Sequence, residues 1–208
     1  MKKELLLSKL QGFDPEIFAI LQDEIQRQRY MLSLVPNNNA MSPFAHYLEG
    51  SLLANSAFDA QNPNSNSTNL EDIAIKRAKK LFGSEHAIVR LGNIGAASRV
   101  VCLTLLEPNS RVLSFNLRKA EHCSGLSFTF KNFGIDAKKQ VLDWDEVEQT
   151  ADETKPNMII FSPVSYPRNA NYRRLSEIAR KVGAYLWVDI GQSVGLVAAG
   201  LLPSPVPF

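Results

Sequence analysis

The sequence predicts an α/β domain with a predominantly parallel sheet, helices on both of its faces, and an N-terminal helical arm. Between Ala87 and Asp189, short apolar runs alternate with amphipathic stretches. The run Ala184–Val188 leads directly into the acid Asp189, a pattern typical of a strand buried on both faces of a parallel sheet. The first part of the chain carries helix signals and no strand pattern. We therefore expect a helical arm over residues 1–54 and the α/β domain over residues 55–208.

The composition of the 208 residues is ordinary for a globular protein, with 45% hydrophobic and 21% charged residues. The net charge of +2 is too small to favour nucleic acid or an acidic membrane as a partner. No apolar run approaches the roughly 20 residues of a membrane span, and the run after Met1 stops too soon for a signal peptide. The two cysteines show no metal-binding spacing. We predict a cytoplasmic protein without a metal site.

Two helix starts define the predicted arm. Asp14-Pro15 combines a capping acid with proline at the first helical position, and predicts a helix that fades near Tyr30. Ser42-Pro43 predicts a second, shorter helix by the same logic.

The predicted domain begins with a polar loop. The tract Gln61–Asn69 contains no apolar residue, and a helix over residues 70–81 follows, with Gly83 as its terminating glycine. Strands and helices then alternate. We expect strands at residues 87–91, 111–115, 158–161 and 184–188, and helices at residues 96–106, after Asp143, and at residues 175–182.

Asp189 is the first candidate site residue. It lies where a strand ends, and in open α/β sheets the carboxyl ends of the strands are where ligands bind. The alternative is a polar residue that only caps the next element. Gly92–Gly95 lies between a predicted strand and a helix start, where free N–H groups make an anion site. It matches no nucleotide fingerprint, and the alternative is a plain turn.

His122 is the third candidate site residue. The alternative is a surface residue, which is the usual place of a lone histidine in a loop. Pyridoxal phosphate needs a phosphate cradle, a flat group over its ring and an acid on its pyridine nitrogen. Gly92–Gly95, His122 and Asp189 could supply these three groups in turn. The sequence therefore favours pyridoxal phosphate as the cofactor.

The chain also resembles the serine hydroxymethyltransferase family, whose members are also called glycine hydroxymethyltransferases, over almost its whole length. The matching runs lie at residues 74–83, 105–108, 165–168, 182–189, 195–200 and 203–207. The resemblance implies a fold-type-I major domain, pyridoxal phosphate, a dimer, and the conversion of serine to glycine with one-carbon transfer to tetrahydrofolate.

The resemblance also implies roles for single residues. Asp189 would hold the pyridine nitrogen, His122 would stack on the ring, and the turn from Asn93 to Gly95 would take the phosphate. Gln192 stands where the family has a histidine after the acid. On the substrate side, Asn38 and Asp59 stand where the family has two glutamates of its arm.

Several departures predict that ordinary catalysis is lost. The family lysine that carries the cofactor lies on a strand past the end of this chain, and the last lysine here is Lys181. Val164 replaces a cofactor-contacting serine, Ala57 replaces a tyrosine, and Glu121 puts a carboxylate where the folate would pass. One alternative function is a non-catalytic scaffold or partner subunit that uses the family dimer surface. Another is one half of a split enzyme.

The tail from Gly195 to Phe208 is apolar and proline-rich. Such a tail predicts either a fragment of a longer protein or a surface that packs against a partner. We expect a homodimer, or an obligate complex with another chain, that uses the arm near Leu34–Pro43 and covers this tail.

Overall fold

The computed structural model describes residues 3–35, 38–55, 66–115, 127–164 and 166–208. Its contacts divide the chain into two compact units, Met1–His46 and Tyr47–Phe208, and each unit is described here by itself. The division into an arm of residues 1–54 and a domain of residues 55–208 remains a prediction.

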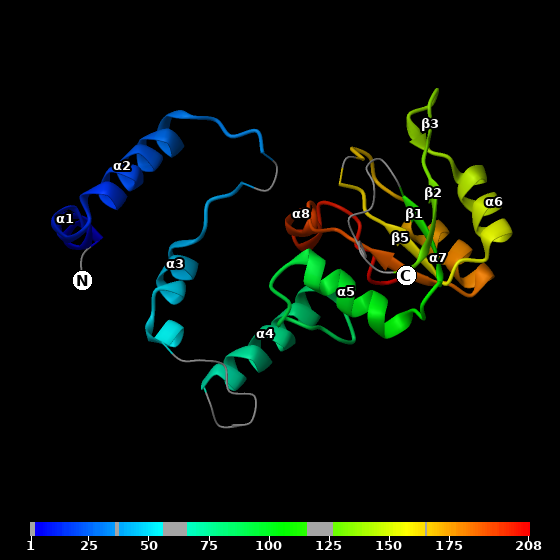
Figure 1. Cartoon of the computed structure of the whole chain (residues 1–208), viewed down its shortest axis with the longest axis horizontal. Helices are drawn as coiled ribbons and strands as arrows, with labels where there is room; N and C mark the ends of the chain where they lie inside the picture. Colours follow the sequence, from blue (N-terminus) through cyan, green and yellow to red (C-terminus); the bar gives the residue numbers. More distant parts are fainter. Residues whose placement is uncertain (1–2, 36–37, 56–65, 116–126, 165) are drawn as a thin grey trace. The chain divides into compact units, whose positions relative to one another are not determined.

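The first unit is helical (Figure 1). It contains α1 (Lys3–Phe13), α2 (Pro15–Tyr30) and the start of α3 (Pro43–Glu49). The side chain of Asp14 accepts a hydrogen bond from the N–H of Ile17 at 3.0 Å, which confirms the predicted cap of α2. Ser42 caps α3 in the same way. The α1 helix was not predicted, because the apolar run after Met1 was interpreted only as a possible signal peptide.

The second unit begins with the short 3₁₀ helix η1 (Leu52–Asn55) and with α4 (Asn66–Phe82). The α4 helix starts inside the tract predicted as a loop and ends at Gly83, whose φ of 68° is the left-handed conformation of a terminating glycine. The prediction of a strand at residues 87–91 is wrong, because these residues form no regular structure and Ile88 is 72% exposed. A strand needs a neighbour for its backbone hydrogen bonds, and the described sheet provides none there.

The main sheet has four parallel strands in the order β2-β1-β5-β6. They are β1 (Arg111–Phe115), β2 (Thr129–Phe133), β5 (Met158–Phe161) and β6 (Tyr185–Val188). A small antiparallel pair, β3 (Ile135–Asp136) and β4 (Val141–Leu142), follows β2 in the sequence. The β1, β5 and β6 strands confirm the predicted strands to within a residue, whereas β2 was not predicted.

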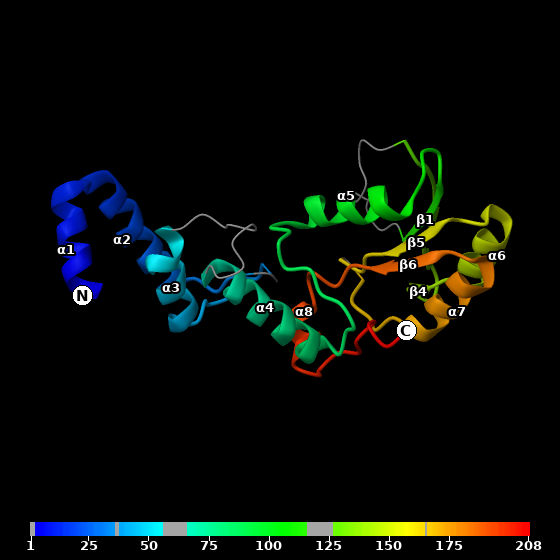
Figure 2. The ribbon, with the colours of Figure 1, turned by 90° about the horizontal axis from the view of Figure 1, so that it is seen from below.

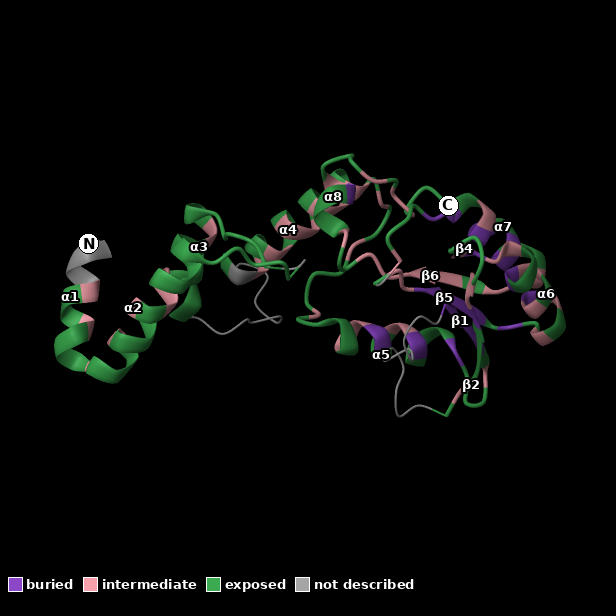
Figure 3. Cartoon of the chain, turned by 90° about the horizontal axis from the view of Figure 1, so that it is seen from above, coloured by how far each residue is buried: buried purple, intermediate pink, exposed green. Residues whose placement is uncertain are grey.

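Helices cover both faces of this sheet, as predicted (Figures 2 and 3). The helices α6 (Trp144–Thr154) and α7 (Tyr172–Val182) close one core, which includes Leu113, Ile159 and Phe161. The α5 helix (Ile94–Leu105) closes the other, in which Cys102 and Leu106 pack on Val112, Met158 and Ile160. In β1, β5 and β6, neighbouring residues therefore point into opposite cores.

The β6 strand corrects one expectation. Its apolar run predicted a strand buried on both faces, but none of its residues is fully buried and Tyr185 is 54% exposed. The reason is its place in the sheet: within the described residues, β6 pairs with β5 alone and forms an edge. Apolar composition therefore predicted the strand correctly but not its position.

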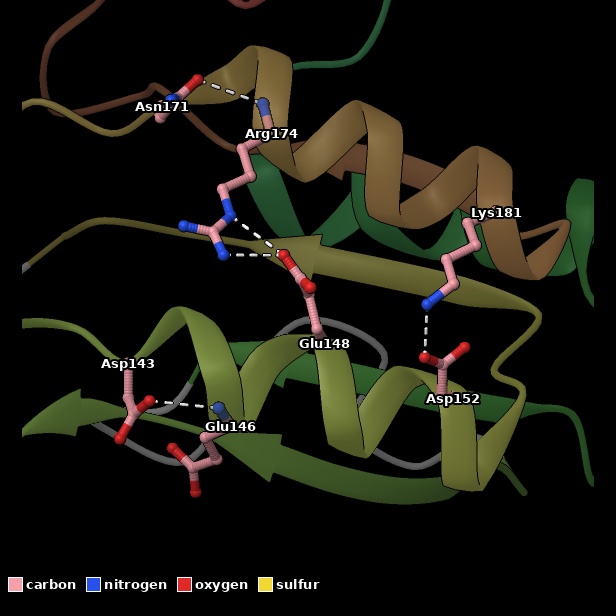
Figure 4. Close-up of polar contacts among 7 residues, drawn as sticks. All are labelled: Asp143, Glu146, Glu148, Asp152, Asn171, Arg174 and Lys181. Carbon is pink, nitrogen blue, oxygen red and sulfur yellow. Dashed lines mark hydrogen bonds and ion pairs between the residues drawn. The ribbon is translucent and has the colours of Figure 1, made fainter.

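The helices α6 and α7 are joined by ion pairs on their exposed sides (Figure 4). Lys181 contacts Asp152 at 2.5 Å, and Arg174 contacts Glu148 at 2.8 Å. Asp143 caps α6 through the N–H of Glu146, which confirms the predicted cap. Two polar side chains of α7, Arg174 and Lys181, therefore contact α6.

The tail after Asp189 forms α8 (Val194–Ala198) and then returns to its own domain. Val197 is buried, and the carbonyl oxygen of Phe208 accepts hydrogen bonds from Ser176 at 2.9 Å and Arg180 at 3.0 Å. Leu201 stays 72% exposed. Part of the tail therefore packs on α7 without any partner chain.

Two observations bear on the predicted compartment. No helix among the described residues is long and apolar enough to cross a membrane. Cys102 is disulfide-bonded in the structure, and the chain's other cysteine, Cys123, lies outside the described residues.

Candidate functional site

Asp189 lies at the carboxyl edge of the sheet. Its N–H donates to the carbonyl of Phe161 at 3.0 Å, so the parallel pairing of β5 and β6 continues one residue past the last strand pair. The ends of the two strands therefore lie side by side. This is the place where open α/β sheets bind ligands, as the sequence predicted for this acid.

Two donors fix the carboxylate of Asp189. The hydroxyl of Ser162, the first residue after β5, donates to Oδ2 at 2.9 Å. The N–H of Gly191 donates to Oδ1 at 2.8 Å. Each oxygen of the carboxylate thus accepts a hydrogen bond, and the two donors orient the carboxylate. The acid is thus held from both the neighbouring strand end and its own loop.

Gly191 lies close to the acid. A Cβ atom at this position would lie 3.1 Å from Oδ1 of Asp189, which is tighter than ordinary van der Waals contact. Any side chain here would require the carboxylate to shift by a few tenths of an ångström. Glycine therefore lets the loop after β6 follow the acid without moving the carboxylate.

A cavity of about 200 Å³ adjoins Asp189. It is bounded by the loop that follows β5 and by the residues that follow β6. Its lining includes the predicted Gln192, together with Pro163, Val164, Tyr166, Arg168, Tyr172 and Leu202. Burial raises the pKa of the Tyr172 phenol, so this group is a neutral donor at physiological pH. The structure therefore brings Asp189 and Gln192 together in one mixed apolar and polar pocket.

Asn93 and Gly95 stand at the start of α5. The side-chain oxygen of Asn93 accepts from the N–H of Ala96 at 2.8 Å, so the residue caps its own helix. The α5 helix packs on the sheet and joins β1 through a short loop, so its N-terminus points to the end where the strands finish (Figure 2). Main-chain donors for an anion are present there, but residues 93–95 offer neither a hydroxyl nor a cationic side chain.

Three further residues were predicted for the site, namely Asn38, His122 and Asp59. Asn38 belongs to the first unit, where its side-chain amide donates to the hydroxyl of Ser33 at 3.0 Å. His122 and Asp59 lie outside the described residues. Within the described ranges, no group of three or more metal-binding side chains occurs.

Sequence reasoning missed Ser162. Nothing in the local sequence around Ser162 marks it as a site residue. The pairing of the neighbouring strands β5 and β6 could nevertheless have identified Ser162. Once β5 and β6 are paired in register, Phe161 lies opposite Val188, and the next residue on each strand is Ser162 and Asp189.

The chemistry of this site fits one end of pyridoxal phosphate better than the other. An oriented carboxylate beside a partly apolar cavity suits a protonated pyridine nitrogen. The turn at Asn93 offers only main-chain groups to the phosphate. The fold and this acid define an α/β domain of the pyridoxal-phosphate-dependent transferase type.

A comparison with protein-family models gives the particular family. The serine hydroxymethyltransferase model matches residues 10–208, so the chain belongs to the serine hydroxymethyltransferase family. Members of this family depend in general on pyridoxal phosphate, and they generally form oligomers. The resemblance inferred from the sequence is confirmed.

Proposed function

We propose that this chain is a serine hydroxymethyltransferase-like protein that binds pyridoxal phosphate at Asp189 but does not by itself convert serine to glycine. The observation that carries the proposal is the pair of hydrogen bonds that fixes Asp189 beside a cavity without a lysine in its described lining. The acid for the ring nitrogen is therefore kept, while the amine that the reaction needs is absent from that lining.

The chain's own residues have distinct parts in this proposal. Pyridoxal phosphate supplies an electron-withdrawing ring when it is bound. Asp189 holds the proton on the ring nitrogen, and its negative charge balances the positive charge there. By the family resemblance, main-chain groups at Asn93 and Gly95 would hold the phosphate, and His122 would stack on the ring.

Lys181 cannot take the place of the missing amine. It is the last lysine of the chain, and it lies on α7 before β6 begins, whereas Asp189 follows the end of β6. Four strand residues separate the two ends, which is roughly 13 Å along the strand. The ammonium group of Lys181 is moreover paired with Asp152 at 2.5 Å.

The proton chemistry is also reduced. Gln192 and Val164 line the cavity where the family has a histidine and a serine. Asn38 stands at the position of the family's arm glutamate, and an amide cannot accept a proton as a carboxylate does. These substitutions also leave tetrahydrofolate without a clear role. They point to a binding protein and not to a complete enzyme.

The test is a titration of the purified chain with pyridoxal phosphate, followed by absorbance, beside an assay of folate-dependent glycine formation. We expect saturable binding that is weakened by Asp189→Ala, and no glycine formation. Borohydride should attach no cofactor at one specific lysine. Glycine formation that disappears in Asp189→Ala would overturn the proposal of inactivity, and equal binding by both proteins would overturn the assigned site.

A second proposal is that another polypeptide completes the enzyme. The edge position of β6 supports it: among the described strands β6 pairs with β5 alone, and an apolar edge strand is suited to accept another strand. A neighbouring reading frame that encodes the missing strand and lysine would favour this split enzyme. Mixing the chain with that polypeptide should then restore glycine formation, and its failure to do so favours a scaffold role.

We also propose that the protein associates through its arm. No residue of α2 is buried, and Phe13 is 89% exposed. Large apolar side chains that stay exposed in this number are expected at an interface. A homodimer, or an obligate complex with another chain, would cover it. Sedimentation at low micromolar concentration tests this, and a stable monomer would contradict it. The cytoplasmic location likewise remains a proposal.

A further inference from the structure

Ser162 contacts the candidate ring-nitrogen acid from a different strand. Its hydroxyl donates to Oδ2 of Asp189 at 2.9 Å, in a partly buried hydrogen bond between residues 27 positions apart in the sequence. The other oxygen of the same carboxylate is held by the N–H of Gly191. Each oxygen of the carboxylate therefore has a described donor, one from a side chain and one from the main chain.

The chemical nature of the side-chain donor matters. A hydroxyl is neutral, so it can orient a carboxylate without cancelling its negative charge. A guanidinium or an ammonium group in its place would lower the attraction of the carboxylate for a cationic ring N–H. Ser162 therefore suits an acid whose task is to meet a positive charge in the adjoining cavity.

We propose that Ser162 is a positioning residue for Asp189, which sets the carboxylate to accept the ring N–H of a pyridinium ligand. This inference rests on the proposed function, because it takes Asp189 as the partner of the ring nitrogen. Ser162 itself does not touch the ligand in this proposal. Its removal loosens the carboxylate and weakens only the contact to that nitrogen.

Two ligands and a matched set of variants test the inference. The ligands are pyridoxal phosphate and its analogue in which a CH group replaces the ring nitrogen. Ser162→Thr keeps the hydroxyl, and Ser162→Val has nearly the same shape without it. Asp189→Asn is the positive control for loss of the charged acceptor. Dissociation constants are measured by fluorescence, and thermal unfolding reports whether each variant folds.

We expect the wild-type chain to prefer pyridoxal phosphate over the analogue. Ser162→Val should lose roughly tenfold of that preference, as for a hydrogen bond to a charged group, while Ser162→Thr keeps it. A merely structural role would weaken both ligands equally and would overturn the inference. Should Ser162→Val not fold, Ser162→Ala carries the same test.

The experiment distinguishes a failure of the proposed function from a failure of the role proposed for Ser162. No preference in the wild-type chain shows that Asp189 does not meet a ring nitrogen, so the proposed function fails and this inference with it. A wild-type preference that Asp189→Asn abolishes and Ser162→Val preserves overturns only the role of Ser162.

Discussion

Arg174 donates two hydrogen bonds, from Nε at 3.0 Å and from Nη2 at 2.8 Å, to the same carboxylate oxygen of Glu148. The pair joins α7 to α6 (Figure 4). The same guanidinium lies 4.9 Å from the centre of the Trp144 ring. One side chain therefore connects two helices through both a charge pair and an aromatic face.

The first prediction concerns this arginine. Arg174→Ala should destabilise the domain by about 1 kcal/mol, because it removes a part-exposed ion pair and a cation–π contact. Glu148→Gln removes only the charge pair and should cost less. Urea unfolding followed by circular dichroism measures both. Equal effects of the two variants would show that the contact with Trp144 contributes nothing.

The second prediction concerns pH. Hydrogen bonds from Lys181 first, and then from Lys155, lower the pKa of Asp152 below its ordinary value of 3.8. A carboxyl whose folded pKa is depressed contributes stability above its ordinary pKa, and this contribution is lost as the pH falls through the lower folded pKa. Asp152→Asn should therefore reduce stability at pH 6 and have less effect at pH 2.

The matched control is Asp145→Asn on the same helix, since Asp145 has no ion pair with any residue that the structure describes. Chemical unfolding at the two pH values measures the difference. The prediction is wrong if Asp152→Asn and Asp145→Asn change stability equally at pH 6.

The third prediction concerns α2. Hydrogen bonds from Arg27, and next from Gln28, lower the pKa of Glu24 to about 2. Arg27→Ala should move this pKa upward, towards the ordinary value of 4.5, because the largest cause of the shift is removed. A carbon-detected NMR titration of the Glu24 carboxyl follows it. An unchanged titration would contradict the contact.

The fourth prediction compares two glycines. Gly183 ends α7 with a φ of 73°, so Gly183→Ala should destabilise the domain by about 1–2 kcal/mol. Gly12 lies within α1, and a Cβ there would meet nothing within 4 Å. Gly12→Ala should instead raise helix stability by about 0.5–1 kcal/mol. Circular dichroism during urea unfolding measures the two effects, whose opposite signs are the test.

The sequence predicted those elements whose pattern is local. The runs at β1 and β5 are apolar and fully or nearly fully buried, and Asp143 caps its helix through a bond three residues away. The β2 strand was missed because Phe133 is its only buried residue, so its run lacks an apolar pattern. Local pattern predicts what a segment can form.

The incorrect and missed predictions have a common cause. Whether a segment forms a strand, and where that strand lies in the sheet, depends on its neighbours in space. The run at residues 87–91 is apolar enough for a strand, yet no described strand pairs with it. The edge position of β6 and the bond from Ser162 to Asp189 both depend on which strand lies beside which. The acid could be predicted from its own run, whereas its orienting hydroxyl could not.

The bond between Gly191 and Asp189 gives the protein an internal spectroscopic sensor. An amide proton that donates to a carboxylate changes its chemical shift when the charge or direction of that carboxylate changes. Because Gly191 is two residues from the acid and its N–H lies 2.8 Å from Oδ1, its NMR signal reports on Asp189 without any label. Glycine amides also resonate in a sparsely populated spectral region. Ligands that approach the acid can thus be screened by following one peak.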